Sequence, residues 1–314
     1  MKPLLLVASI LVMVVAGGWQ RAPVAADEPV FVFSGWNDEN NADAWDLYSL
    51  TLSGESKIIV GGPENKVYPF PFPNERAIGY LTERSRSDER QIFKHNLDSR
   101  ADTPLGISIY ADSTCQVSPD GKQLACGDRN GRYSQIVVFD LATKAKRQLT
   151  SFKNYCTDPS WSPDGKNLVY VIGALAEIVG GAAKPPGKHL VMYNFDTNTH
   201  RLLTRVQDAK DGYPRWSPDG QWVAFHRPTK VGRGWNLWLI RPNGTEETQL
   251  TVTDREDSHP EWSPDSKRIA FQSYRSRQTF DIYIVDVATK SLTRVTETDD
   301  TEEQQPIWIP QAKR

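Results

Sequence analysis

The chain has 314 residues, with 37 Lys and Arg against 39 Asp and Glu and a formal net charge of −2. This near balance gives no overall attraction to nucleic acid, so a charged partner must be recruited by a local surface. Only three cysteines occur, Cys115, Cys126 and Cys156, and an odd number in a chain of this length excludes a protein held together mainly by disulfides.

Residues 1–26 predict a secretory signal peptide. Lys2 precedes an apolar run from Leu4 to Val15, and Val24-Ala-Ala26 supplies the small residues of a cleavage site. The apolar run is too short to cross a bilayer comfortably, so we expect a periplasmic or secreted protein with no membrane span after cleavage. An uncleaved anchor is the alternative. Residues 27–314 then form a single domain.

Two β-rich segments follow the signal. Val30-Phe-Val-Phe33 and Asp46-Leu-Tyr-Ser-Leu50 have the apolar and aromatic character of strands, but no opening strand precedes them. Near the other end, Gln305-Pro-Ile-Trp308 has the character of an opening strand with nothing after it. We therefore predict that the two ends pair to make one unit.

Between these segments one phrase recurs, a bulky apolar residue, a Pro-containing turn and an apolar strand. Its anchors lie 44 to 55 residues apart. In the turn, proline fixes φ and the glycine permits a positive φ. The clearest copies are Trp161-Ser-Pro-Asp-Gly165, Trp216-Ser-Pro-Asp-Gly220 and Trp262-Ser-Pro-Asp-Ser266, with weaker ones anchored at Phe72, Val117 and Trp308.

One period contains four predicted strands. In the best period these are Pro260–Ser263, Arg268–Gln272, Asp281–Asp286 and Leu292–Thr296. Four short strands per repeat are typical of a propeller blade rather than a solenoid. Six anchors and the pairing of the two ends predict an all-β, six-bladed β-propeller of four-stranded antiparallel blades, closed by its N- and C-terminal segments. An open β-solenoid or a sandwich is the alternative.

The repeated Pro-x-Trp-Ser-Pro-Asp-Gly, followed by Ile/Val-Ala-Phe, Ile-Tyr-Ile-Val-Asp and a closing Leu-Thr, resembles the TolB-like propeller repeat of exported bacterial proteins. The resemblance covers about Asp27 to Arg314 and implies a fold more than a function. TolB itself has an α/β domain before its propeller, which we expect to be absent here because the first strand begins near Val30. The resemblance also extends to peptidase gating domains and a metal-dependent pectate-fragment lyase, but no Gly-x-Ser-x-Gly elbow is present.

The repeat places a collar of side chains at the channel mouth, where each opening strand begins. Its predicted binding residues are Asp158, Asp211, Tyr213, Asp257, His259, Glu303 and Gln305. No resident cofactor is expected, but these groups would suit a channel cation (calcium or a transition metal) or the amine of a peptide or sugar. The alternative is that they cap turns and line a water-filled channel. His259 is expected to be the only imidazole on this face, so a cluster of histidine metal ligands is not.

Loops between the second and third strands of the blades predict a basic rim outside the collar. We hypothesise that this rim recruits an anionic partner by its local field. The alternative is that these are ordinary solvated loop charges. Its residues are Arg84, Arg86, Arg129, Arg132, Arg227, Arg233, Arg275 and Arg277.

Three further features carry expectations. A Gly bulge at Gly121 would pair Cys115 with Ala125 and turn Cys126 to the other face, so no disulfide is expected there. The recurring tryptophans should pack between blades, which leaves Trp36, Trp45 and Trp235 as the aromatic binding candidates. The stretch Ile172 to Lys188 is either a lid over the channel or a tolerated insertion.

The sequence as a whole predicts a noncatalytic exported binding or scaffold propeller that is a monomer. Its partner would be an envelope or secreted protein, or an anionic glycan, engaged through the channel face. No catalytic residues are assigned, because no paired catalytic constellation occurs. The alternative function is a metal-assisted lyase or hydrolase acting on an acidic sugar, for which His259 and the carboxylates are the only support.

Overall fold

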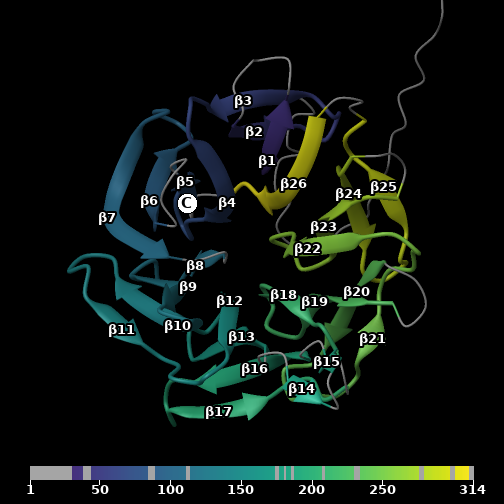
Figure 1. The fold of residues 1–314 in the computed structure, drawn as a ribbon. Helices are drawn as coiled ribbons and strands as arrows, with labels where there is room; N and C mark the ends of the chain where they lie inside the picture. The colour runs from purple at the N-terminus through teal and green to yellow at the C-terminus, as the bar shows by residue number, and fades with distance from the viewer. Residues whose placement is uncertain are drawn as a thin grey trace, which may run out of the picture.

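The computed structural model describes residues 30–37, 44–83, 89–110, 114–173, 177–179, 182–184, 187–206, 209–229, 234–275, 279–297 and 301–310. In these residues every regular element is a strand, and six four-stranded antiparallel sheets stand around a centre (Figure 1). The predicted all-β, six-bladed propeller is confirmed. The predicted signal peptide lies outside the described residues.

Five blades follow one another along the chain, with the β14–β15 hairpin inserted in the third, and the first strand of each lies nearest the centre in Figure 1. Blade 1 is β4 (Asn65–Pro71), β5 (Ala77–Glu83), β6 (Glu89–Asn96) and β7 (Asp102–Tyr110). Blade 2 is β8 (Cys115–Val117), β9 (Gln123–Asn130), β10 (Tyr133–Asp140) and β11 (Lys146–Gln148). Blade 3 is β12 (Tyr155–Trp161), β13 (Asn167–Gly173), β16 (Lys188–Asn194) and β17 (Thr199–Leu202).

Blade 4 is β18 (Gly212–Trp216), β19 (Val223–Pro228), β20 (Trp235–Ile240) and β21 (Thr248–Gln249). Blade 5 is β22 (Asp257–Trp262), β23 (Arg268–Ser273), β24 (Asp281–Asp286) and β25 (Leu292–Arg294). Within the predicted insertion, β14 (Glu177–Val179) and β15 (Ala182–Lys184) form a separate two-stranded hairpin. Whether that hairpin acts as a lid stays untested.

The sixth blade joins the two ends of the chain, as predicted. We call it the clasp blade, and its order is β26 (Thr301–Trp308), β1 (Phe31–Asn37), β2 (Trp45–Leu50) and β3 (Ser56–Val60). The register places Phe31 opposite Trp308 and Val32 opposite Ile307. Figure 1 shows β26 and β1 side by side, at the two ends of the colour scale. The last strand therefore completes the first sheet.

The repeated tryptophans pack between blades, as predicted. Trp161, Trp262 and Trp308 each direct Nε1 to a backbone carbonyl of the preceding blade, at 3.2, 3.0 and 3.1 Å respectively. Trp161 and Trp262 are also nearly fully buried in hydrophobic clusters that include residues of two adjacent blades. Each tryptophan therefore combines apolar burial with a satisfied indole N–H.

The closing Leu-Thr of the repeat has a polar role that the sequence did not reveal. The Oγ1 atoms of four threonines accept a hydrogen bond of 2.9 to 3.0 Å from a backbone N–H at the start of the blade's third strand. All four threonines are buried. Without this acceptor a buried N–H would lack a partner. The four pairs are Thr150 with Ile136, Thr204 with Leu190, Thr251 with Leu237, and Thr296 with Ile282.

The expectation about the cysteines was wrong, because Cys115 and Cys126 form a disulfide with a Cα–Cα distance of 4.3 Å. The turn between β8 and β9 does not introduce the expected register shift. Ser118 donates its N–H to the carbonyl of Gln123, and Cys115 then lies directly opposite Cys126. This pair is a non-hydrogen-bonded one, in which the two side chains of an antiparallel ladder approach most closely. Cys156 is a free, buried thiol.

No helix in the described part of the chain is long and apolar enough to cross a membrane.

Candidate channel-mouth site

Five blades share one backbone irregularity, located where the opening strand begins near the centre of the ring. In each, the residue before a proline has a positive φ, and the register of the opening strand shifts there. A left-handed backbone costs a non-glycine residue about 1–3 kcal/mol and clusters at functional sites. The residues are Tyr68 (φ 53°), Asp158 (54°), Tyr213 (48°), His259 (54°) and Gln305 (57°). We call these five residues the collar.

Blade 2 is the exception. Cys115 occupies the position that proline has in the other five blades, and Thr114 before it has no positive φ. The pairing of β8 with β9 runs without a register shift from Cys115 to Val117. In this blade, therefore, the disulfide stands where the others have a bulge.

Aromatic rings from blades 4 and 5 gather at the collar. The ring centroid of Tyr213 lies 3.6 Å from that of His259 and 5.1 Å from that of His226. His226 in turn contacts Trp235 at 4.6 Å and lies 6.1 Å from His259. Trp235 was a predicted aromatic candidate, and the structure places it behind the collar, against a histidine that the sequence did not assign to this face.

The expectation that His259 is the only imidazole here was therefore wrong. His226 lies on β19 directly opposite Gly212, the residue before Tyr213. A Cβ at Gly212 would come within 2.2 Å of His226 Nε2, so the missing side chain makes room for the ring. Antiparallel pairing could have predicted this position from the sequence. The end of a blade's second strand lies opposite the start of its first strand.

A short polar chain orients His259. Ser258 Oγ donates to Glu256 Oε1 at 2.7 Å and lies 3.2 Å from His259 Nδ1. Since the serine proton is used by the glutamate, His259 Nδ1 is the donor to Ser258 and Nε2 is left unprotonated. His259 Nε2 and His226 Nδ1 are buried and have no hydrogen-bond partner.

Burial keeps both rings neutral. It lowers the pKa of His226 to about 3, with a smaller effect from Lys188. It also holds the pKa of His259 well below its usual range, with His226 and Arg215 adding to the effect. Burial raises the pKa of the Tyr213 phenol well above its usual value, and Asp158 contributes. This part of the site is uncharged at neutral pH.

Asp158 is the acid of the collar. It is buried, accepts a hydrogen bond of 3.0 Å from Thr157 Oγ1, and burial raises its pKa although Arg215 and Lys188 oppose that effect. Arg215 is itself paired with Glu261, whose Oε2 lies 2.9 Å from Nε. The acid is thus placed among groups of blades 3, 4 and 5.

Gln305 ties the clasp blade to its neighbours at the collar. Its Oε1 accepts the backbone N–H of Tyr68 at 2.7 Å, and its own N–H donates to Gln272 Oε1 at 2.9 Å. Blades 5 and 1 are thereby linked through one residue of the last strand. The collar residues of neighbouring blades are therefore connected to one another by hydrogen bonds.

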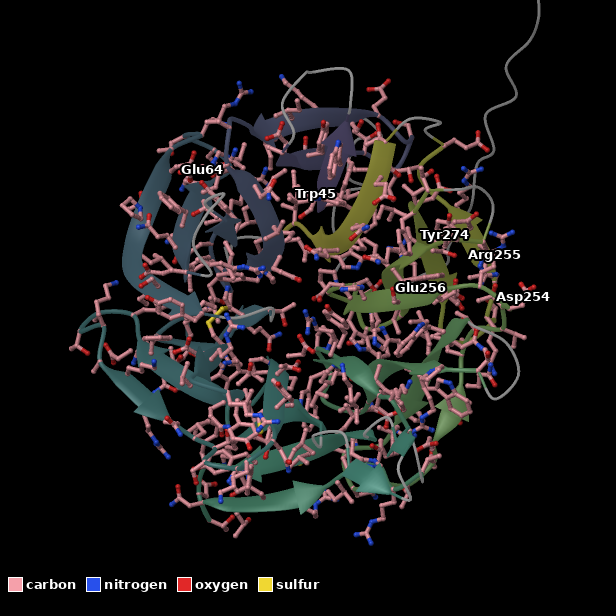
Figure 2. The ribbon with its side chains drawn as sticks, in the orientation of Figure 1. Trp45, Glu64, Asp254, Arg255, Glu256 and Tyr274 are labelled. Atoms are coloured by element: carbon pink, nitrogen blue, oxygen red, sulfur yellow. A yellow bond between two sulfur atoms is a disulfide. The ribbon has the colours of Figure 1, made fainter. Side chains whose placement is uncertain are left out.

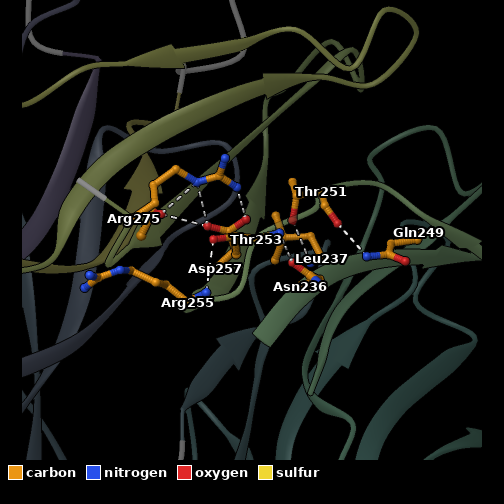
Figure 3. A network of polar contacts seen from close by, with 9 residues as sticks. Asn236, Leu237, Gln249, Thr251, Thr253, Arg255, Asp257 and Arg275 are labelled. Atoms are coloured by element: carbon orange, nitrogen blue, oxygen red, sulfur yellow. Dashed lines mark hydrogen bonds and ion pairs between the residues drawn. The ribbon is translucent and has the colours of Figure 1, made fainter. Parts of the chain in front are cut away.

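Two predicted collar acids and two predicted rim arginines form ion pairs with one another. Asp211 accepts from Arg227 Nε at 2.6 Å and from Nη2 at 3.0 Å, and Asp257 forms the same kind of pair with Arg275 (Figure 3). Both carboxylates are fully buried. Ser273 also donates to Asp257 at 2.7 Å. Asp211 immediately precedes β18 and Arg227 lies on β19, whereas Asp257 begins β22 and Arg275 follows β23. Arg227 also pairs with Glu247.

The remaining predicted residues are spread around the ring. Glu303 is fully buried on β26, opposite Gly35 of β1. Arg132 is exposed in the turn between β9 and β10, and Arg129 is half-buried at the end of β9. The other rim residues lie outside the described residues and are Arg84, Arg86, Arg233 and Arg277.

The loop before β22 is held between two neighbouring loops on this face. Trp235 donates its N–H to the carbonyl of Arg255 at 2.7 Å, and Tyr274 donates to that of Glu256 at 2.8 Å. Figure 2 shows Asp254, Arg255, Glu256 and Tyr274 on the side of blade 5, and Trp45 on the clasp blade. Trp36 and Trp45 were both predicted aromatic binding candidates. Their ring centroids lie 5.8 Å apart.

Nowhere in the described ranges do three or more His, Cys, Asp or Glu side chains come together as they would around a metal ion. The described residues therefore provide no such cluster of metal ligands. Of the predicted acids, Asp211 is paired with Arg227, and Asp158 accepts a hydrogen bond from Thr157.

Comparisons with known proteins agree with this description. Residues 184–314 match the family model PD40, described as the TolB beta propeller domain. This match covers less than half of the chain. The chain has the fold of a six-bladed β-propeller, and residues 184–314 of it resemble the TolB beta propeller domain.

The crystal structure of TolB from Acinetobacter baumannii is similar over 91% of this chain and 68% of that one, with a TM-score of 0.74 and 17% identity. An oligogalacturonate lyase in complex with manganese is similar over 86% of this chain and 73% of that one, with a TM-score of 0.54 and 18% identity. Likenesses at this level of identity show the fold alone.

Among curated proteins, the uncharacterized protein Atu1656 of Agrobacterium fabrum is 25% identical over 150 residues, which are 46% of this chain and 45% of that protein. The chain spans less than half the length of the curated relatives that it matches.

Proposed function

We propose that this chain is an exported, noncatalytic binding or scaffold propeller that engages a protein or glycan partner through its channel face. The observation that carries the proposal is the collar. Five blades each hold a strained residue at the same place, and together these residues offer aromatic rings, a carboxylate and an amide. Apolar surface with a few placed polar groups suits recognition of a partner.

Export is supported by two independent features. Residues 1–26 have the pattern of a secretory signal, and the Cys115–Cys126 disulfide is of a kind that persists in oxidising compartments such as the periplasm. Cell fractionation, with N-terminal sequencing of the mature protein, tests this part. A full-length N-terminus in the cytoplasmic fraction would contradict export.

Capture from the envelope fraction tests the role of the collar. Tyr213→Ala removes the central ring of the site, and Ile58→Ala removes an exposed apolar side chain, 38% exposed, from the outer strand β3. We expect wild type and Ile58→Ala to retain the same partner and Tyr213→Ala to lose it at least about tenfold, the loss that follows removal of a central interface residue. Equal capture by all three proteins, with unchanged circular dichroism, would reject the collar as the binding site.

An anionic glycan is the version of the proposal that involves the basic rim. Pairing of Arg227 and Arg275 with buried aspartates reduces the free positive charge there, and exposed Arg132 remains a candidate. If the rim recruits the glycan, affinity on an acidic glycan panel should fall as salt rises. Affinity that does not change with ionic strength would remove the rim from the proposal.

The alternative of a metal-assisted lyase or hydrolase has one observation in its favour, the approach of His226 to His259. The described residues provide no third ligand of the usual kind, so we derive no reaction from them. Metal analysis of the purified protein tests this function. A stoichiometric transition metal that is lost in His259→Ala would favour it over simple binding.

A further inference from the structure

Two tryptophans of the clasp blade lie outside the collar. Trp36, near the end of β1, is directly opposite Trp45, at the start of β2. Their ring centroids are 5.8 Å apart, and the ring planes make an angle of 80°. Trp36 is 36% exposed and Trp45 is half-buried. The two rings therefore contact each other and remain accessible to solvent, unlike Trp161 and Trp262, which are nearly fully buried between blades.

The same row of the sheet contains a carboxylate. β26, β1 and β2 lie side by side (Figure 1), and Glu302 of β26 is directly opposite Trp36. Residues directly opposite each other in an antiparallel sheet point to the same face, with their Cβ atoms about 4.5–5.5 Å apart. Glu302, Trp36 and Trp45 are thus neighbours in one row across three strands. We call these three residues the clasp row.

Two amide side chains hold the ends of the clasp row. The backbone N–H of Trp45 donates to Asn65 Oδ1 of blade 1 at 3.0 Å. At the other end, Gln304 Nε2 donates to Glu302 Oε2 at 3.1 Å. Both amides are neutral. The contacts therefore fix the row without cancelling the charge of the glutamate.

The negative charge of Glu302 is not compensated within the part of the chain that the structure describes, since no lysine or arginine there forms an ion pair with it. In the four described strands of the clasp blade, Lys57 of β3 is the only Lys or Arg. It pairs with β2 at a point four residues from Trp45, which is about 13 Å along the strand. Lys66 of blade 1 is buried and lies 3.7 Å from the Asp46 carboxylate. A carboxylate without a cation therefore stands beside two accessible indole rings.

We propose that the clasp row binds an alkylammonium group, the chemistry shared by quaternary amines and lysine side chains. A cation is attracted to the face of an aromatic ring when it lies within about 6 Å of the centroid, and tryptophan attracts cations best. Because the centroids of Trp36 and Trp45 are 5.8 Å apart, one ammonium group can lie within this distance of both. Glu302 supplies the opposite charge at the end of the row.

A second pair of aromatic rings shows what the carboxylate adds. Tyr133 and Tyr155 join blades 2 and 3, with ring centroids 6.2 Å apart and ring planes at 64°. Tyr155 is directly opposite Gly173 rather than an acid, and Tyr133 follows the exposed Arg132. This pair has similar geometry but the wrong charge for a cation. It therefore provides a matched control for the clasp row.

The proposal goes beyond the binding role of the collar and does not depend on it. Glu302 precedes the collar residue Gln305 by three residues on β26, a distance of about 10 Å along the strand. None of the three residues of the clasp row has the positive φ that defines the collar. Tyr213→Ala should therefore leave binding at the clasp row unchanged.

NMR of the indole N–H signals during titration with choline tests the site. The neutral alcohol in which a carbon atom replaces the nitrogen of choline is the matched ligand, because it has the same shape and no charge. We expect choline to shift the signals of Trp36 and Trp45 and to bind at least about tenfold more tightly than this alcohol. Equal affinity for the two ligands, or choline binding that shifts neither signal, overturns the proposal.

A lysine derivative distinguishes the two sources of an alkylammonium group. N-acetyl-lysine methylamide is titrated beside the same compound acetylated on its side-chain nitrogen, which has no charge. Preference for the charged form would support the site and indicate a protein partner. Binding of choline alone would also support it and indicate a small molecule. Binding of neither charged ligand rejects it.

Variants test which residues carry the binding. Trp45→Leu should weaken choline binding about tenfold, and Glu302→Gln should weaken it and reduce its dependence on salt. Tyr155→Leu is the control for the ring, and Glu55→Gln, at an exposed position in the turn between β2 and β3, is the control for the charge. Neither control should change binding. Equal losses in a variant and its control would overturn the assignment to the clasp row.

The comparison of choline with the neutral alcohol uses the wild-type protein, so it decides the proposal even if a variant fails to fold. Circular dichroism identifies such a variant. Loss of partner capture in Tyr213→Ala with unchanged choline binding would support both proposals separately. Normal partner capture by wild type without any choline binding would reject the clasp row and leave the collar proposal intact.

Discussion

At the scale of single residues, buried ion pairs are the most consequential finding. The sequence suggested an acidic collar and a separate basic rim, but acids of the first pair with arginines of the second. Removing one member of such a pair leaves the other charge without compensation in a site closed to water. Asp211 is fully buried and bonded to two guanidinium nitrogens of Arg227. These residues are therefore more important for stability than their position near the channel suggests.

We expect Arg227→Met to lower the free energy of unfolding by about 3–5 kcal/mol, because it removes the arginine that pairs with the buried Asp211 carboxylate. The exposed pair of Arg76 with Asp98 is a suitable control, since the two side chains are 36% and 65% exposed. Arg76→Met should cost less than about 1 kcal/mol. Urea denaturation followed by circular dichroism measures both. Similar losses in the two variants would show that burial of the Asp211 pair is not decisive.

His226 makes stability depend on pH. Its pKa is about 3 in the folded protein and about 6.5 in an unfolded chain, so the unfolded state binds the extra proton. This contribution is complete above pH 6.5 and is lost as pH falls toward 3. One such histidine should cost about 2 kcal/mol between pH 7 and pH 5.

The test is the urea midpoint of wild type and His226→Gln across that pH range. We expect a shallower dependence on pH in the variant, whatever its absolute stability. An equal slope in the two proteins would mean that His226 is not buried in its neutral form.

At the scale of strands and turns, the blades could be predicted from the repeat because each recurring residue type has one structural role in every blade. Trp161, Trp262 and Trp308 identified the opening strands, and the Ser-Pro-Asp turns marked the following hairpins. The disulfide was missed because one assumption about the turn at Gly121 shifted the register by one residue, and such a shift moves every side chain to the other face. Register in a short hairpin is decided by turn geometry, which composition alone does not fix.

The Cys115–Cys126 bond should stabilise the propeller by about 2–3 kcal/mol, the value for a closed loop of this size. Cys115→Ser/Cys126→Ser should lose that amount, and reduction should destabilise wild type equally while leaving the double variant unchanged. Thermal denaturation with and without a reductant measures this. Alkylation of three thiols rather than one in the unreduced, denatured protein would show that the disulfide is absent.

The closing threonines permit a matched test of one hydrogen bond. Thr251→Val removes the oxygen that accepts the Leu237 N–H at 3.0 Å and leaves that buried donor without its partner. The expected loss is about 1–3 kcal/mol. Thr293→Val, at an exposed position of β25, should change stability little. A neutral Thr251→Val would imply that water replaces the hydroxyl.

At the scale of the whole molecule, the closed ring could be predicted because its two incomplete ends, near Val30 and Gln305, were complementary. The collar positions were predictable from the repeat as well. Their relation to one another was not, because contacts such as Tyr213 with His259 join different blades and depend on the curvature of the ring. The position of His226 beside the collar was missed because the repeat motif describes the first strand of each blade. His226 lies on the second strand, and the motif does not show which residue pairs with it.

Closure by the clasp blade can be tested by removing it. Truncation after residue 300 deletes β26 and exposes the edge of β1, so we expect aggregation or a broad, noncooperative thermal transition. Ile307→Ala keeps the strand but empties a site that is 3% exposed. It should cost about 2–5 kcal/mol while the transition stays cooperative. A sharp transition in the truncated protein would mean that closure is dispensable.

The clasp blade also constrains the order of events during synthesis. The segment Phe31–Val60 emerges early, yet the strand that completes its sheet is the last of the described strands to be made. Until then three strands have an unfilled edge, the condition in which nascent chains associate wrongly. A factor that keeps the polypeptide unfolded until β26 has been made would therefore serve this architecture, and ring closure would be the step at which the protein leaves such a factor.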